Sequence, residues 1–507
     1  MSVDLPDSLK GGELARLIPV ANCSQKERCA ASVLLATLSV VRPFADIALT
    51  TLNRGLGSRT VVTAFTEVVL KKQVPDVSCR PDGLLVVSTP RSEWRALIEA
   101  KIGTAKINTA QLSLYTKLAA LNDIDAVITI SNELTSLPQH PPYAIPAGST
   151  GRVEIFHWSW MKLITLATIL LSSADDEFDP EQHFILKEML RYFSHESTEV
   201  RGFHQMNPEW PALVASVHSG ANVHKAQSQV IATIGAWHQE QSDMCLILSR
   251  KLKVAVATRL KKFHRDNQAA RVEFDAEEFA MTKRLAAAFE IPNLAGPIEV
   301  VADALKRNII CQMCVDAPED KKRYESRLNW LLRQLPEAPE VPVGVHIRWK
   351  NGGASFGWLS DLRANPKAAD IDRAGALPRS FEVFTVTDLG KKFSGTKNFI
   401  EILEVAVPQF YDNVARHVRA WQPSPMTGPV EGEETLADTV ASLPEPKQPS
   451  RRIVRRGEVG SGRFVMFEDG SIEVETPQGL RRFRNIEELL STAKSASSKP
   501  ISQPLTS

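Results

Sequence analysis

Two short apolar runs that follow one another constrain the fold of this chain more than any other feature. They are Leu84–Val87 and Trp94–Ile98, and the residues between them are polar or turn-forming. Short unbroken apolar runs bounded by turn signals indicate strands that are buried on both faces. The stretch therefore predicts a pair of adjacent strands inside a sheet that other elements cover.

Charged residues stand at the ends of both runs. Asp82 lies just ahead of the first run, and Glu99 and Lys101 follow the second. Side chains alternate along a strand, so Glu99 and Lys101 point the same way, about 6–7 Å apart. Asp82 joins them only if the pairing register sets it opposite an odd-numbered residue such as Glu99, because a slip of one residue turns it to the other face.

Two carboxylates and an amine at one strand edge are the layout of a metal-dependent phosphodiesterase. The expected cofactor is Mg²⁺ or Mn²⁺, because these hard cations prefer oxygen ligands. The predicted metal ligands are Asp82 and Glu99, with Glu67 of the preceding apolar run as a third acid. Lys101 is the predicted catalytic cation, which would orient the attacking water or stabilise charge on the phosphate.

A helix is predicted over residues 106–121, where Gln111 and Tyr115 stand four apart and so share one face. That face either leans over the site or belongs to an ordinary amphipathic helix. Glu99 and Lys101 likewise fit a solvated strand end, and Glu67 fits a surface position. An acid at each of two apolar runs favours the site, because an unpaired buried charge is costly.

The same residues resemble the motifs of the PD-(D/E)xK nuclease superfamily, which has the restriction-endonuclease-like fold. Pro81-Asp82 matches the PD half, Glu99-Ala100-Lys101 matches the ExK half, and Gln111 to Tyr115 matches the QxxxY helix of the RecB-like branch. The resemblance covers roughly residues 25–160, under a third of the chain. It implies a nuclease that hydrolyses nucleic acid, with DNA favoured over RNA, in restriction, repair or defence.

The resemblance leaves two alternatives open. The superfamily contains inactive relatives, so the chain could be a binding or scaffold protein that keeps the nuclease fold. The nuclease domain could instead work as a homodimer or only within a defence or repair complex.

Composition limits the remaining possibilities. The formal net charge is +1, so any attraction to nucleic acid must be local. The apolar stretches are too short to span a bilayer, and the polar, acidic N-terminus is unlike a signal peptide. Six scattered cysteines do not form a disulfide framework. These features predict a cytoplasmic protein with no membrane partner.

The chain is expected to divide into five parts. The first has the order α-β-β-β-α-β with a further strand and helix, which predicts a three-layer α/β domain with a mixed sheet. The parts are a nuclease-like domain over residues 1–172, a helical and α/β region of unknown role over 173–421, a flexible Pro-rich linker over 422–450, a small basic β-hairpin module over 451–495 and a disordered tail over 496–507.

The region of unknown role holds a helical pattern from Asn222 to Arg265, and strands are expected again around Val272. The cations of this pattern form either a nucleic-acid footprint or a solvated helical face. They are Arg250, Lys251, Lys253, Arg259, Lys261, Lys262 and Arg265. The arginines of residues 451–495 leave a similar choice between nucleic-acid binding and protein docking.

Two local patterns have less certain chemistry. Helical patterning covers residues 13–53, and Ser24-Gln-Lys-Glu27 has the spacing of a capping box that opens a helix. Cys311 and Cys314 have the spacing of half a zinc site, but the sequence has no second CxxC or CxxH pair to complete it. The same residues also suit a strand.

Overall fold

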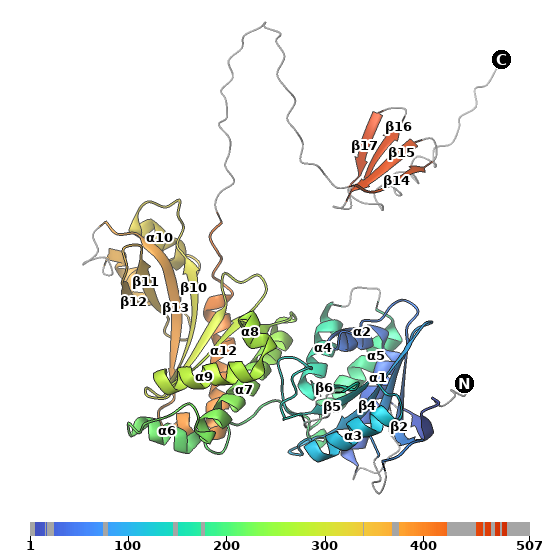
Figure 1. The fold of residues 1–507 in the computed structure, drawn as a ribbon. Coiled ribbons are helices and arrows are strands. Elements are labelled where there is room, and N and C mark those ends of the chain that lie inside the picture. Colours follow the sequence, from blue (N-terminus) through green and yellow to red (C-terminus); the bar gives the residue numbers. More distant parts are fainter. Residues whose placement is uncertain are drawn as a thin grey trace, which may run out of the picture. The chain divides into compact units, whose positions relative to one another are not determined.

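The computed structural model divides the chain into two units, Met1–Pro425 and Met426–Ser507. Figure 1 shows the fold coloured along the sequence. The structure describes residues 6–15, 17, 25–74, 80–145, 151–173, 178–337, 339–367, 375–422, 453–459, 462–467, 472–476 and 479–483.

A six-stranded mixed sheet lies in the N-terminal part of the first unit. Its strands are arranged in chain order, with antiparallel pairing from the first to the fourth and parallel pairing from the fourth to the sixth. They are β1 (Leu9–Leu14), β2 (Val61–Leu70), β3 (Gly83–Ser88), β4 (Glu93–Ala100), β5 (Ala126–Ser131) and β6 (Glu154–Ser159).

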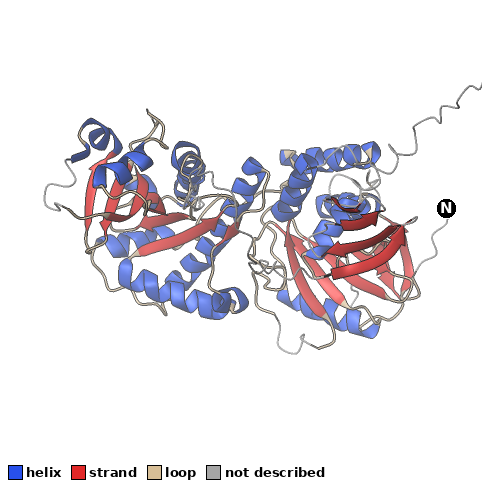
Figure 2. Ribbon diagram, turned by 90° about the horizontal axis from the view of Figure 1, so that it is seen from above, coloured by secondary structure: helices blue, strands red, loops and turns tan. Residues whose placement is uncertain are grey.

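Helices cover both faces of this sheet, as the strands between helices in Figure 2 show. On one face Leu118 of a single helix, α3, packs in a cluster with Leu84 and Leu97. On the other face Leu34 packs in a cluster with Ile98. Burial on both faces explains why β3 and β4 are unbroken apolar runs. The helices are α1 (Lys26–Val40), α2 (Arg42–Thr50), α3 (Thr109–Leu121), α4 (Trp160–Ser173) and α5 (Pro180–Phe193).

Among the described helices, none is by itself both long and apolar enough to cross a membrane. Only α1 and α2 taken together reach that length and hydrophobicity. The chain bends by 107° between them.

The N-terminal segment differs from the helical pattern expected for residues 13–53. Its first described part forms β1, which pairs with β2 at the edge of the sheet. The helix expected at Ser24 begins at Lys26 instead, and Gln25 before it makes no capping side-chain hydrogen bond. The capping box predicted between Ser24 and Glu27 includes Ser24, which lies outside the described residues.

A seven-stranded antiparallel sheet forms the rest of the first unit. Its strand order is β12-β11-β13-β10-β9-β8-β7. The strands are β7 (Ala257–Thr258), β8 (Arg284–Glu290), β9 (Ile298–Asp303), β10 (Asn308–Asp316), β11 (Gly344–Trp349), β12 (Ala354–Trp358) and β13 (Pro378–Asp388). The accompanying helices are α6 (Trp210–His218), α7 (Ser228–Leu252), α8 (Lys262–Asp266), α9 (Gln268–Thr282), α10 (Tyr324–Leu332), α11 (Leu359–Ala364) and α12 (Thr396–Phe410).

Two expectations for this region are corrected. The helical pattern that starts at Asn222 ends with α7, where Lys253 takes a left-handed conformation, and α8 is a separate helix. Val272 lies in α9, and the strands of this sheet begin before it with the two-residue β7 and continue after it with β8. Cys311 is buried and Cys314 is exposed on β10, where residues three apart point to opposite faces. The strand interpretation of this pair is therefore confirmed.

The second unit contains four antiparallel strands in chain order. They are β14 (Ile453–Val459), β15 (Gly462–Phe467), β16 (Ile472–Thr476) and β17 (Gly479–Phe483). β15 and β16 pair in antiparallel fashion, as a β-hairpin module requires, and the residues between them lie outside the described part of the chain. The predicted linker after residue 422 and the predicted tail lie outside the described residues.

Gly83, at the start of β3, has no room for a side chain. A Cβ atom there would lie 2.5 Å from Cδ1 of Leu35 and 2.9 Å from the backbone oxygen of Phe65. We expect Gly83→Ala to lower the free energy of unfolding by about 1–3 kcal/mol, because the backbone of β2 must move. Denaturant unfolding measures the change. Gly151→Ala, whose Cβ would meet nothing within 4 Å, is the matched control, and equal losses in the two variants would contradict this account.

Candidate active site

The pairing of β3 with β4 decides whether the predicted acids meet. Gly83 pairs with Ile98 in this antiparallel ladder. Continuing the ladder by one residue places Asp82 opposite Glu99, and residues directly opposite one another point to the same face. The register is thus the one that the predicted site requires.

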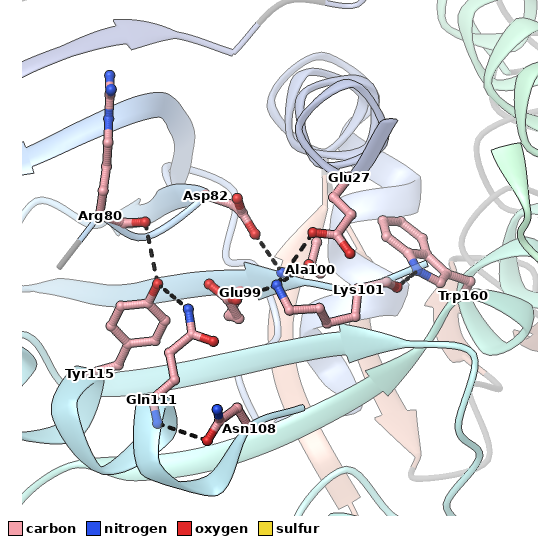
Figure 3. Close-up of polar contacts among 10 residues, drawn as sticks. All are labelled: Glu27, Arg80, Asp82, Glu99, Ala100, Lys101, Asn108, Gln111, Tyr115 and Trp160. Atoms are coloured by element: carbon pink, nitrogen blue, oxygen red, sulfur yellow. Dashed lines mark hydrogen bonds and ion pairs between the residues drawn. The ribbon is translucent and has the colours of Figure 1, made fainter. Parts of the chain in front are cut away.

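Backbone contacts fix the end of β4 (Figure 3). The Ala100 N–H donates to Oδ2 of Asp82 at 2.8 Å, which ties the two strands together beyond the last pair of the ladder. The Lys101 N–H donates to the carbonyl oxygen of Ile130 at 2.7 Å. The indole N–H of Trp160, the first residue of α4, donates to the Lys101 carbonyl at 2.8 Å. Lys101 is therefore held through its main chain from two sides.

One ammonium group stands among three carboxylates. Lys101 Nζ lies 2.6 Å from Oε1 of Glu99 and 3.3 Å from Oε2 of Glu27. The Glu99 side chain is only 5% exposed, whereas that of Glu27, in the first turn of α1, is 35% exposed. Asp82 is the third acid of the group. With all four groups ionised, three negative charges and one positive charge give the cluster a surplus of negative charge.

This surplus changes the acid–base behaviour of the site. Burial raises the pKa of Asp82 to about 7, and the charge of Glu99 adds to the increase. Burial alone would lower the pKa of Lys101, but its hydrogen bond to Glu99 and the surrounding acids raise that pKa overall. At neutral pH the ammonium is charged, while Asp82 is close to its midpoint of titration.

The predicted glutamine and tyrosine of α3 contact each other and the segment ahead of β3. Gln111 Nε2 donates to Tyr115 Oη at 2.8 Å, and the Tyr115 hydroxyl donates to the Arg80 carbonyl at 3.2 Å. Burial and the charge of Glu99 raise the pKa of Tyr115, so its hydroxyl stays protonated. These contacts hold α3 against the residues that lead into Asp82, which is a supporting role.

Glu67 contacts arginines. It has a φ of 55° at an irregularity in the pairing of β2 with β1, a β-bulge. Its carboxylate forms ion pairs with Arg28, at 3.1 Å, and with Arg80. A bulge re-aims the side chains near it, and this one directs Glu67 toward two guanidinium groups.

The cluster opens onto a cleft of about 550 Å³. Asp82 and Glu27 line this cleft. Lys26 and Arg28 of α1 and Thr104, in the loop that follows β4, line it as well. A ligand therefore reaches the acids from solvent. Lys26 and Arg28 stand at the same opening, where Lys26 pairs at 2.6 Å with Glu199, which also lines the cleft, and Arg28 pairs at 3.1 Å with Glu67.

The acids fit a divalent cation by charge and by ligand type. The described residues contain no group of three His, Cys, Asp or Glu side chains arranged to hold a metal ion. Magnesium commonly takes only one or two carboxylates, and completes its shell with water and substrate oxygens. Asp82 and Glu99, beside each other in a cluster with surplus negative charge, meet that requirement.

Two contributors to the site have no local signal in the sequence. Glu27 lies far ahead of the motif, and its spacing from Ser24 suggests a capping role instead. Trp160 lies well after the motif, in what reads as an ordinary helix start. Both reach Lys101 only because α1 and α4 pack against the sheet near the end of β4. No short sequence motif marks these two residues, so only the tertiary structure identifies them.

Comparisons with known proteins identify no relative. Neither the protein-family models, nor the curated proteins, nor the solved structures contain a match to this chain. The interpretation of the site depends on its own geometry and chemistry.

Asp82 is expected to make the metal-free protein less stable as the pH rises. Its pKa moves from an ordinary value of 3.8 to about 7 on folding, so the folded state binds the extra proton between those values. The free energy of unfolding then falls from about pH 4 to pH 7. Asp82→Asn removes this fall, and above pH 7 we expect the variant to be the more stable protein by roughly 1–3 kcal/mol.

Urea unfolding in the presence of a chelator, at pH 5 and at pH 8, measures this difference. The stability gap between Asp82→Asn and the wild type should widen from the lower to the higher pH. A gap that does not change with pH would show that Asp82 titrates normally.

Proposed function

We propose that the N-terminal α/β region is a magnesium-dependent nuclease with a restriction-endonuclease-like, PD-(D/E)xK core. The register of β3 and β4 carries the proposal, because it sets Asp82 beside Glu99 and Lys101. The order of elements supports it, since α1, the antiparallel strands β2 to β4, α3 and the parallel strand β5 follow the α-β-β-β-α-β order of that core.

Asp82 and Glu99 would hold the cation in this proposal. When bound, Mg²⁺ supplies a Lewis acid and lowers the pKa of a coordinated water. The Lys101 ammonium stabilises the negative charge that develops on the phosphate. Glu27 acts through Lys101, because its carboxylate holds the ammonium at the mouth of the cleft. Neutralisation of the acids by a cation also favours the ionised form of Asp82.

The substrate in this proposal is a nucleic acid, and the motif resemblance favours DNA. Lys26 and Arg28 at the opening of the cleft support a polyanionic substrate, since their partly exposed ion pairs with Glu199 and Glu67 are weak and phosphates would replace those acids as partners. Restriction, repair and defence in the cytoplasm are the roles that fit such an enzyme.

A cleavage assay with plasmid, linear and single-stranded DNA, with and without Mg²⁺, tests the proposal. We expect Lys101→Ala to cleave at least ~100-fold more slowly than the wild type, which is the scale of losing one strong electrostatic contributor. Lys106→Ala is the matched control, because its side chain is 82% exposed on the same loop. Circular dichroism establishes that both variants fold.

Equal cleavage by the wild type and Lys101→Ala would place the activity elsewhere. A wild-type protein that binds DNA but cleaves no substrate would identify a binding or scaffold protein that keeps the nuclease fold.

Substitution distinguishes the two candidates for a further acid. Glu27→Gln removes a charge that contacts Lys101, and we expect it to slow cleavage about 10–100-fold, as loss of an outer-shell partner does. Glu67→Gln breaks partly exposed ion pairs with Arg28 and Arg80, which are worth about 1 kcal/mol or less. The cleavage rate of Glu67→Gln should stay within about threefold of the wild-type rate, because the loss of a weak ion pair changes free energies only slightly. The reverse ranking would favour Glu67 as a metal ligand.

A further inference from the structure

The seven-stranded sheet has one face, here called the outer face, that is partly open to solvent. The inner face packs in the large core, to which Cys311, Val345 and Val383 belong. Neighbouring strands pair in register, so one row of outer-face residues crosses most of the sheet. The row consists of Trp358, Gly344, Phe384, Gln312, Glu299 and Ala288.

Four aromatic rings gather at the β12 edge of the outer face. His346 stacks on Phe384 with ring centres 4.6 Å apart. Phe356 lies 5.6 Å from His346 and 5.2 Å from Trp358. Phe356 is 47% exposed and Trp358 is 39% exposed, although both are large apolar side chains. These four residues are named the edge aromatic cluster.

Gly344 provides the space that one of these rings occupies. A Cβ atom on Gly344 would lie 2.5 Å from Cζ of Phe384, so the ring of Phe384 occupies the space above that glycine. Phe384 is buried beneath the exposed rings of Phe356 and Trp358 and supports them. Aromatic rings fixed in this way lose little conformational entropy on binding a ligand.

A second aromatic group lies at the opposite end of the outer face. Phe263 is 64% exposed and Phe274 is 43% exposed. His264 packs on Phe274 at 4.8 Å, and Lys261 Nζ lies 5.7 Å from the centre of the same ring. A pocket of about 320 Å³ joins this group to the sheet, since His264 and Phe274 line it together with outer-face residues such as Ala288. These residues, with Lys261, are named the α8 cluster.

The segment that carries α8 is mostly positive, although Phe274 itself stands on α9 between Glu273 and Asp275, and Arg259 pairs with Glu290 at 3.6 Å. Residues 258–267 carry the cations Arg259, Lys261, Lys262 and Arg265 against the single acid Asp266. Two acids of the outer face are engaged by neighbours: Glu382 by Arg348 and His346, and Glu299 by the Gln312 amide. Other cations of the same sequence pattern belong elsewhere, because Arg250 bonds to Thr165 and Lys251 to Asp412.

We propose that the outer face binds a single strand of nucleic acid. Its bases stack on the edge aromatic cluster and on the α8 cluster, and its phosphates lie near the cations of residues 258–267. Exposed rings combined with cations are the usual means of binding single strands, whereas a duplex hides its base faces. Four cations interleaved with exposed rings favour a polyanion over an apolar protein segment. The inference rests on the proposed function for the class of ligand, but it concerns a different surface of the protein.

Fluorescence anisotropy with the full chain tests this inference. A Lys101→Ala background and a chelator prevent cleavage, and the probes are a labelled oligothymidine and a duplex of the same length. We expect the single strand to bind more tightly than the duplex. Trp358→Ala and Phe263→Ala should each weaken binding of the single strand about 10-fold, the scale of one lost base–aromatic stack.

Phe184→Ala is the matched control, because Phe184 is also 64% exposed but lies on α5, away from the outer face. Circular dichroism melting verifies that all variants fold. The inference is wrong if duplex binds as tightly as single strand, or if the two variants bind like Phe184→Ala. Loss of self-association in Trp358→Ala, with unchanged oligothymidine affinity, would identify the outer face as a protein interface.

The result is independent of the outcome at the candidate active site. If the nuclease proposal fails, the wild type cleaves nothing. The single strand still binds more tightly than the duplex, and Trp358→Ala and Phe263→Ala still weaken binding of the single strand. If only the outer-face inference fails, cleavage by the wild type and its loss in Lys101→Ala persist.

Discussion

The antiparallel register of β3 and β4 is the constraint on which the candidate site depends. Both strands are buried on both faces, so their hydrophobicity does not distinguish this register from one shifted by a residue. The Ala100 N–H bond to the Asp82 carboxylate adds a contact that belongs to the observed pairing alone. The bulge at Glu67 interrupts the pairing of β2 with β1. The pairing of β2 with β3 stays regular.

Electrostatics explains why the acids gather at a strand end and open onto solvent. A group of acids in the core would cost several kcal/mol for each unpaired charge. At the end of β4, Glu99 is buried and Lys101 compensates it at 2.6 Å. Burial raises the pKa of Asp82, and the charge of Glu99 adds to the increase. The protein thus accepts local instability at a place where a cation or a substrate can relieve it, a common property of functional sites.

The sequence was sufficient where the signal was local. Alternation predicted that Glu99 and Lys101 share a face, whereas Asp82 required one particular strand register, and the structure has that register. Glu27 could not be predicted, because its contact with Lys101 depends on how α1 packs. The end of α7 at Lys253 was missed for another reason: no glycine or proline marks this left-handed residue. Likewise, the open outer face follows from the packing of helices on the sheet, which periodicity does not determine.

Lys101 has a fixed main chain and a flexible side chain. Its main chain is fixed by Ile130 and by the indole of Trp160. Its amine, in contrast, sits at the tip of a flexible four-carbon stem with three rotatable donors. The tip can exchange Glu99 for a new anion by rotation about side-chain bonds alone. Such an exchange requires no loop closure and no movement of β4.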